Sequence, residues 1–182
     1  MLLTGGLWIA FVAYWSASAR NAAPAASRES PASRAVHTRL LNLTFLLLFV
    51  PVPGLRGRFL PSGTLIVAAG LAVQTLGVAL AAWARSHLGR NWSAEISSAS
   101  GHQLVRSGPY RLVRHPIYTA MFVMAAGTAI VSGEMHALLA IAVLAGAYWR
   151  KIRLEEQSLV GTFGAEYGEY RRSTWALIPG LF

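Results

Sequence analysis

Two polar stretches in the C-terminal half of the chain hold the side chains best suited to chemistry. The first, residues 85–118, contains His115 and Tyr118, and the second, residues 150–172, contains Glu155. Imidazole, phenol and carboxylate groups form strong charge-assisted hydrogen bonds, and they also transfer protons. We therefore expect a binding or catalytic site where these two stretches meet.

Several other kinds of chemistry are not expected. The chain has no cysteine, which excludes disulfides, thiolate metal ligands and a cysteine nucleophile, and we predict no metal site. The formal net charge is +9, but the arginines lie between apolar runs rather than in a basic stripe with interleaved aromatic residues. We therefore expect no nucleic-acid partner.

The elements that position the polar stretches are expected to be membrane helices. Hydrophobic residues make up 54% of the chain and charged residues 13%, about half the charged share of a soluble domain. A bilayer core requires about 20 mostly apolar helical residues. The composition predicts an all-α, polytopic integral membrane protein with about five transmembrane helices. The expected spans are residues 2–19, 40–52, 64–84, 118–131 and 135–149.

The chain is expected to form a single membrane-embedded domain. Residues 1–85 would supply the N-terminal spans, and residues 86–182 the ligand-binding half. Residues 132–134 alone separate the last two apolar segments, which predicts a tight helical hairpin that brings the two polar stretches together. Small residues on both helices predict close mutual packing. These residues are Ala125, Ala126, Gly127, Ala142, Ala145, Gly146 and Ala147.

The distribution of basic residues predicts an orientation. Alternate connections hold 14 of the 16 lysines and arginines, and such connections stay in the cytoplasm. The N-terminus is therefore expected outside an inner or plasma membrane, and the polar stretches inside. Residues 21–39 lack apolar periodicity, so we expect them to be flexible or to lie on lipid headgroups without a chemical role.

Local signals predict helix boundaries within the polar stretches. Gly108 and Pro109 favour a turn, and Pro116 favours the first turn of a helix whose free amides could bind a carboxylate. The last apolar helix is expected to continue as an amphipathic helix that ends near Gly164.

Two expectations concern the charged residues of that amphipathic helix. Lys151 and Glu155 are one turn apart and could form an ion pair. Glu155 and Glu156 point in different directions on a helix, so only one carboxylate is expected to reach a ligand. Plainer interpretations remain open: Arg114 and His115 could anchor headgroups, and tyrosines at a membrane boundary could belong to an aromatic belt.

Taken together, the motifs resemble those of a known enzyme family. They are Gly108-Pro109-Tyr110, Arg114-His115-Pro116 with Tyr118, Glu155-Glu156, and Phe163-Gly164 with Tyr167 and Tyr170. This order around a short helical hairpin resembles the isoprenylcysteine carboxyl methyltransferase family, over roughly the C-terminal half of the chain. The related phospholipid methyltransferases are similar. The resemblance implies a multi-span enzyme that uses S-adenosylmethionine without a G-x-G-x-x-G motif, which this chain lacks.

The resemblance also implies roles for individual residues. The cofactor would contact His102, Gln103, Leu104, Val105, Tyr110, His115, Pro116, Ile117, Tyr118 and Glu155. An acceptor carboxylate would need only a cationic clamp, from Lys151, Arg153 or Arg171. Lys151 stands where eukaryotic members have a substrate-binding arginine. An amine or hydroxyl acceptor would instead need a base, for which His115 and Glu156 are candidates.

The favoured function is methyl transfer from S-adenosylmethionine to a lipophilic acceptor, most simply the carboxylate of a prenylcysteine-like molecule. A phospholipid or another isoprenoid lipid is an alternative acceptor. Two further hypotheses are a nicotinamide-dependent membrane reductase and a non-enzymatic membrane subunit such as a channel, transporter or assembly protein. The expected partners are the lipophilic substrate and membrane lipids.

Overall fold

The computed structural model describes residues 1–20, 29–89 and 104–180. These residues form six α-helices and a short 3-10 helix, and the prediction of an all-α chain is confirmed. The helices are α1 (Leu2–Ala19), α2 (Pro31–Phe49), α3 (Thr64–Leu88), α4 (Pro116–Ser132), α5 (Met135–Phe163) and α6 (Ala165–Ser173), with the 3-10 helix η2 (Gly108–Arg111) before α4.

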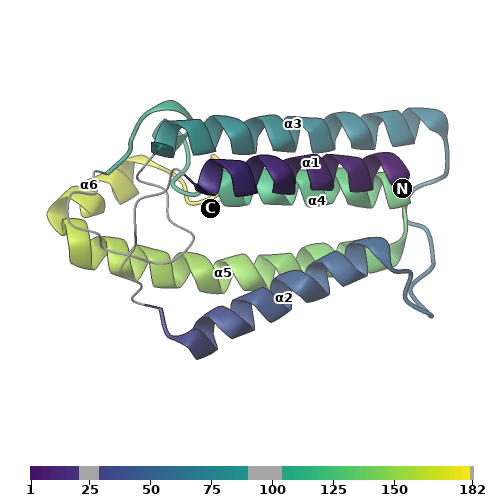
Figure 1. Cartoon of the computed structure of the whole chain (residues 1–182), viewed down its shortest axis with the longest axis horizontal. Helices are drawn as coiled ribbons and strands as arrows, with labels where there is room; N and C mark the ends of the chain where they lie inside the picture. Colours follow the sequence, from purple (N-terminus) through teal and green to yellow (C-terminus); the bar gives the residue numbers. More distant parts are fainter. Residues whose placement is uncertain (21–28, 90–103, 181–182) are drawn as a thin grey trace.

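The long helices lie roughly parallel in two groups. α1, α3 and α4 run side by side, and α2 lies along α5 (Figure 1). The buried core includes Trp8 and Phe11 from α1, Leu48 from α2 and Met124 from α4. Trp8 also donates a hydrogen bond to Thr128 across a distance of 3.0 Å, which ties α1 to α4.

Two helices, α1 and α3, are long and apolar enough to cross a membrane by length and composition. α4 is apolar but shorter, with 17 residues. The five predicted apolar segments overlap α1 to α5 in order, but the number of spans that cross a membrane stays a prediction. The predicted start at Pro116 and end at Gly164 are confirmed by α4 and α5.

The expectation that residues 21–39 form no packed element is wrong for the part that the structure describes, while their lack of a chemical role stays a prediction. α2 begins at Pro31, because Ser30 accepts a hydrogen bond from the Ser33 amide at 3.2 Å and caps the helix. Proline at the first helical position and a serine cap are local start signals that outweigh the weak apolar periodicity. Residues 21–28 lie outside the described residues.

The small residues were predicted to pack α4 closely against α5, but the glycines show that the close approach of α4 is to α3. Gly127 of α4 packs on α3, where an added Cβ would lie 2.5 Å from the Gln74 amide nitrogen and 2.6 Å from the Gly70 carbonyl oxygen. An added Cβ at Gly146 of α5 would meet no atom within 4 Å. α4 and α5 do contact each other as a hairpin, but the glycine-mediated close approach joins α3 to α4.

Replacing Gly127 by alanine is expected to lower the free energy of unfolding by about 1 to 3 kcal/mol, because the new methyl group overlaps the α3 backbone. Thermal unfolding in detergent measures this effect. Gly146→Ala is the matched control, and its stability should be unchanged or higher, since alanine is the better helix former. Equal stability of the two variants would contradict the close α3–α4 packing.

The described parts of both polar stretches lie at one end of the helices. This end holds the C-terminal ends of α1, α3 and α5 and the N-terminal ends of α2 and α4, with α6 beside them (Figure 1). The opposite end holds the turn between α4 and α5, where Phe59 donates a backbone hydrogen bond to Gly133 at 2.9 Å. The described parts of the two polar stretches therefore share one end as predicted, while their orientation in a membrane stays a prediction.

Candidate functional site

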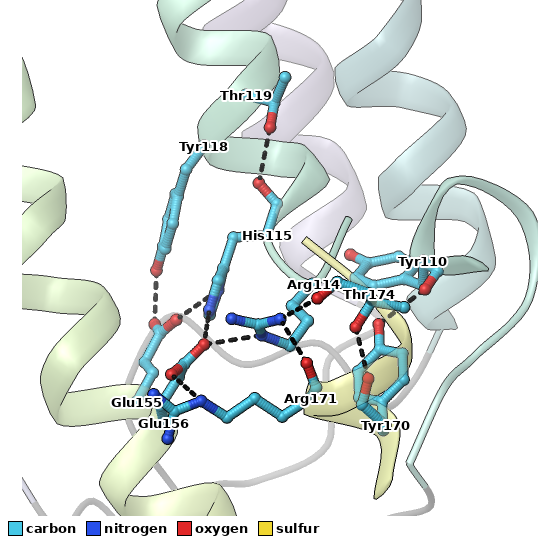
Figure 2. Close-up of polar contacts among 10 residues, drawn as sticks. All are labelled: Tyr110, Arg114, His115, Tyr118, Thr119, Glu155, Glu156, Tyr170, Arg171 and Thr174. Carbon is cyan, nitrogen blue, oxygen red and sulfur yellow. Dashed lines mark hydrogen bonds and ion pairs between the residues drawn. The ribbon is translucent and has the colours of Figure 1, made fainter. Parts of the chain in front are cut away.

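His115 lies between two carboxylates where α4 begins. Its Nδ1 atom is 3.5 Å from Glu155 Oε2, and its Nε2 atom is 3.4 Å from Glu156 Oε1 (Figure 2). The hydroxyl of Tyr118, one turn into α4, donates a hydrogen bond to Glu155 Oε1. Both glutamates therefore lie beside the imidazole ring, and the expectation that only one of them reaches a ligand stays a prediction.

Arg114 holds Glu156 from the other side. Its Nε atom donates to Glu156 Oε1 at 2.8 Å, and both side chains are about one tenth exposed. The same guanidinium donates to the backbone carbonyls of Arg171 and Thr174. Arg171 adds a longer contact, with Nε 3.4 Å from Glu156 Oε2. Arg114 therefore links α5 to the segment that follows α6.

That segment, residues 174–177, forms a C-terminal clasp. It pairs with the backbone before α4: the Arg114 amide donates to Trp175 at 2.8 Å, and the His115 amide donates to Ala176 at 3.0 Å. Thr119 of α4 donates its hydroxyl to the Leu177 carbonyl at 2.7 Å. The clasp thus fixes the backbone of His115. Sequence reasoning missed it, because residues 174–177 carry no motif.

A second group of contacts links η2 to α6. Tyr170 of α6 donates its hydroxyl to the Tyr110 carbonyl at 2.7 Å, and both rings are buried (Figure 2). Arg106 lies over the Tyr170 ring, 5.6 Å from its centroid, and pairs with Glu166 at 3.1 Å. The tyrosines of the sequence motif therefore position the turn that leads to His115.

A row of stacked aromatic rings extends the site from His115 to α5. The His115 and Tyr118 rings are stacked with centroids 5.5 Å apart, and the Tyr118 and Tyr148 rings are stacked at 4.3 Å. His37 of α2 lies beyond Tyr148 at 5.8 Å. Sequence reasoning missed Tyr148 and His37, and only the helical spacing of Tyr148 and Glu155, two turns apart, could have indicated the former.

The buried cluster shifts the protonation of its members. Burial lowers the pKa of His115, but hydrogen bonds to Glu155 and Glu156 outweigh burial and raise it above 6.5. Burial raises the pKa of Glu156, but hydrogen bonds from His115 and Arg114 outweigh burial and lower it to about 2. At neutral pH, Glu156 is therefore a carboxylate, and the two glutamates favour the protonated form of His115.

These two shifts predict how stability depends on pH. Glu156 has a lowered folded pKa, so its contribution is present above 4.5 and is lost as pH falls toward 2. His115 has a raised folded pKa, so its contribution is complete below 6.5 and is lost as pH rises through the raised value. The unfolding temperature in detergent should therefore be highest between these limits. Glu156→Gln should flatten the acid side, and an unchanged acid side would contradict the assignment.

The structure brings together most of the residues predicted for the site. They are Tyr110, His115, Pro116, Ile117, Tyr118, Glu155, Glu156 and Arg171. Leu104 and Val105 are half-buried just before η2. Arg153 is exposed and lies over the Trp149 ring, 4.4 Å from its centroid, which separates it from the cluster. His102 and Gln103 lie outside the described residues.

Lys151 does not form the predicted pair with Glu155. Its Nζ atom lies 2.8 Å from Glu29 Oε2, just before α2, and both side chains are buried. The prediction considered only neighbours on one helix, whereas the partner comes from a segment 122 residues away. Glu29 was assigned no role from the sequence.

Comparisons with known proteins agree with this geometry. A profile of the isoprenylcysteine carboxyl methyltransferase (ICMT) family matches residues 69–161, half of the chain. The cobalt-zinc-cadmium resistance protein CzcN of Cupriavidus metallidurans is 38% identical over 122 residues, which are 65% of this chain and 53% of that protein. The protein-S-isoprenylcysteine O-methyltransferase of Saccharomyces cerevisiae is 32% identical over 64% of this chain and 47% of its own length.

A solved structure shares the fold. It is the eukaryotic intramembrane Ras methyltransferase ICMT, determined without a monobody, and it superimposes with a TM-score of 0.57 at 24% sequence identity. The match covers 84% of this chain and 54% of that chain. This protein spans about half the length of the relatives named here. The matched profile runs from α3 into α5 and includes Arg114, His115, Glu155 and Glu156, so the chain belongs to the isoprenylcysteine carboxyl methyltransferase family.

Proposed function

We propose that this protein transfers a methyl group from S-adenosylmethionine to the carboxylate of a lipophilic, prenylcysteine-like acceptor. The observation that carries the proposal is the cluster of His115, Glu155, Glu156 and Tyr118, which is built within the segment that matches the family. Family relatives from yeast and plants are named as protein-S-isoprenylcysteine O-methyltransferases, which supports the same reaction here.

The site offers groups that fit the cofactor. α4 has no side-chain cap, so its first amides, at Ile117 and Tyr118, lack helical partners and favour an anion such as a carboxylate. Glu155 is about one quarter exposed and can accept hydrogen bonds from an ammonium group. The buried Tyr110 hydroxyl has no hydrogen-bond partner among the described residues, which is typical of a polar group that meets a ligand.

In this proposal the chain mainly binds, orients and excludes water. The cofactor supplies an electrophilic methyl group on a sulfonium sulfur. The free amides of α4 would hold the cofactor carboxylate beside His115, and Glu155 would accept hydrogen bonds from its amino group. Leu104 and Val105 line the approach to η2. Alignment of this kind can supply a large share of a rate enhancement without any proton transfer.

The surroundings of the two candidate bases favour a carboxylate acceptor over an amine or hydroxyl. Both ring nitrogens of His115 face carboxylates, and Glu156, with a pKa of about 2, is a very weak base. Neither residue can readily take a proton from the acceptor. A carboxylate arrives ionised and needs no base. Glu156 is then a positioning residue for His115 and Arg114.

The proposed setting is an integral membrane protein with the site at the cytoplasmic face and the N-terminus outside. α1 and α3 are apolar enough to span, and the described parts of both basic polar stretches share the end that holds the site. The apolar tail of the acceptor would enter from the bilayer. Photo-crosslinking of a prenyl probe should label α4 and α5, and labelling confined to the connections would contradict this route.

The direct test of the reaction uses purified protein in detergent with S-adenosylmethionine carrying a labelled methyl group. N-acetyl-S-farnesylcysteine is the acceptor, its carboxamide is the control, and a phospholipid is the competing acceptor. We expect a base-labile methyl ester on the carboxylate and no product from the carboxamide. Methylation of the phospholipid alone, or of none of the three, would contradict the proposal.

A further inference from the structure

A buried ion pair lies beside the cluster on the side of α2. Lys151 Nζ and Glu29 Oε2 are 2.8 Å apart, with side-chain exposures of 7% and 2%. Ser33 of α2 donates its hydroxyl to the other oxygen of Glu29 at 2.6 Å, and Arg150 donates to the Ser33 hydroxyl at 2.6 Å. The position of the Glu29 carboxylate is therefore set by contacts on both sides.

The pair is close to the proposed reaction centre. Lys151 precedes Glu155 by one turn of α5, a rise of about 6 Å. His37 of α2 packs on Tyr148 of α5, and Tyr148 stacks on Tyr118, whose hydroxyl contacts Glu155. The first turns of α2 therefore form an edge of the same site.

Lys151 is the cation best placed to receive an acceptor carboxylate. Arg114 is held by Glu156 and two backbone carbonyls, and Arg171 contacts Glu156 from an exposed position. Arg153 is exposed beside Trp149. Lys151 is buried, where the attraction between an ammonium and a carboxylate is stronger than in water.

We propose that Glu29 is an internal competitor for the acceptor carboxylate on Lys151, and that it sets the specificity of the site; this inference rests on the proposed function in taking the acceptor to be a carboxylate. Without an acceptor, a buried Lys151 would be costly unless Glu29 neutralised it. With an acceptor bound, its carboxylate and the Glu29 carboxylate would lie against the same buried ammonium and repel each other. The acceptor therefore binds at the expense of the Glu29 contact.

The substitution Glu29→Gln tests this competition with little change of shape. The amide oxygen still accepts hydrogen bonds from Ser33 or Lys151, so the anchor of α2 is retained, but the negative charge is removed. The dissociation constant of N-acetyl-S-farnesylcysteine should fall about tenfold, which is the scale of coupling within a close charge pair. The dissociation constant of its carboxamide should change less than about twofold, because no charge is involved.

Calorimetry in detergent measures both dissociation constants for wild type, Glu29→Gln and Glu29→Asp. Glu29→Asp keeps the negative charge, so N-acetyl-S-farnesylcysteine should bind to it about as weakly as to the wild type. Tenfold tighter binding of the carboxylate alone supports competition. Equal changes for the carboxylate and the carboxamide, or weaker carboxylate binding in Glu29→Gln, would overturn it and leave Glu29 as an anchor.

The same measurement separates this inference from the proposed reaction, because binding needs no methyl transfer. If the carboxylate binds more tightly to Glu29→Gln but no ester forms in the wild-type assay, the proposed reaction fails and the competition stands. If the ester forms but the substitution leaves the carboxylate-to-carboxamide preference unchanged, the competition fails and the reaction stands.

Discussion

Replacement of Glu156 by alanine is expected to lower the free energy of unfolding by about 3 to 5 kcal/mol, the range found when one partner of a buried ion pair is removed. Glu156 is the common partner of Arg114, at 2.8 Å, and of His115, at 3.4 Å. Without it, the Arg114 guanidinium loses its carboxylate partner and His115 keeps only Glu155. Chemical or thermal unfolding in detergent measures the loss.

Glu169→Ala provides the control for that experiment. Glu169 is an exposed carboxylate of α6, and its removal should change stability by less than about 0.5 kcal/mol. A second substitution, Arg114→Leu, should recover part of the stability lost in Glu156→Ala, because it removes one uncompensated charge. A loss below 1 kcal/mol in the single variant would show that the buried cluster does not stabilise the fold.

Replacement of Glu155 by alanine is expected to reduce kcat/KM for S-adenosylmethionine by about 100-fold, since truncating one partner of a buried charged contact commonly costs several kcal/mol. Glu155 contacts both His115 and Tyr118, and it is the more exposed of the two glutamates. It is therefore the carboxylate placed to meet a ligand. Initial rates of methyl ester formation at varied cofactor concentration give this ratio.

Two variants calibrate the effect of Glu155. Tyr118→Phe removes a single hydrogen bond to the Glu155 carboxylate and should reduce the same ratio only about fivefold. Glu166→Ala removes an exposed carboxylate that pairs with Arg106 and should have almost no effect. An effect of Glu155→Ala no larger than that of Glu166→Ala would place the cofactor elsewhere.

Features with local sequence signals were predicted well. Proline lacks an amide hydrogen and fixes φ, so Pro116 marks the start of α4. Gly164 adopts a positive φ of 53° at the end of α5, a conformation that glycine allows. The short turn at residues 132–134 correctly placed His115 beside Glu155, because two antiparallel helices with a short connection must bring these ends together.

Features that depend on distant partners were not predicted. The pair of Glu29 and Lys151 joins segments 122 residues apart, and local spacing suggested the wrong partner for Lys151. Gly127 was assigned to the contact with α5, but small residues show only that a helix can approach closely, not which helix it meets. The C-terminal clasp pairs through backbone atoms, which every residue type supplies, and it therefore left no sequence signal.

The site is assembled from three separate parts of the chain. The start of α4 supplies His115, and α5 supplies the two glutamates (Figure 2). The clasp after α6 fixes the backbone of Arg114 and His115. A fourth part of the chain also borders the site: Glu29 pairs with Lys151, and His37 of α2 packs on Tyr148. The uncapped start of α4 beside two carboxylates is suited to binding a ligand with charges of both signs.

The most direct test of the central claim is calorimetric binding of S-adenosylhomocysteine to the purified protein in detergent, with reduced nicotinamide dinucleotide phosphate as the comparison ligand. We predict saturable binding of S-adenosylhomocysteine at one site per chain and no binding of the dinucleotide. A folded sample that binds the dinucleotide, or that binds neither ligand, would contradict the assignment of this site to S-adenosylmethionine.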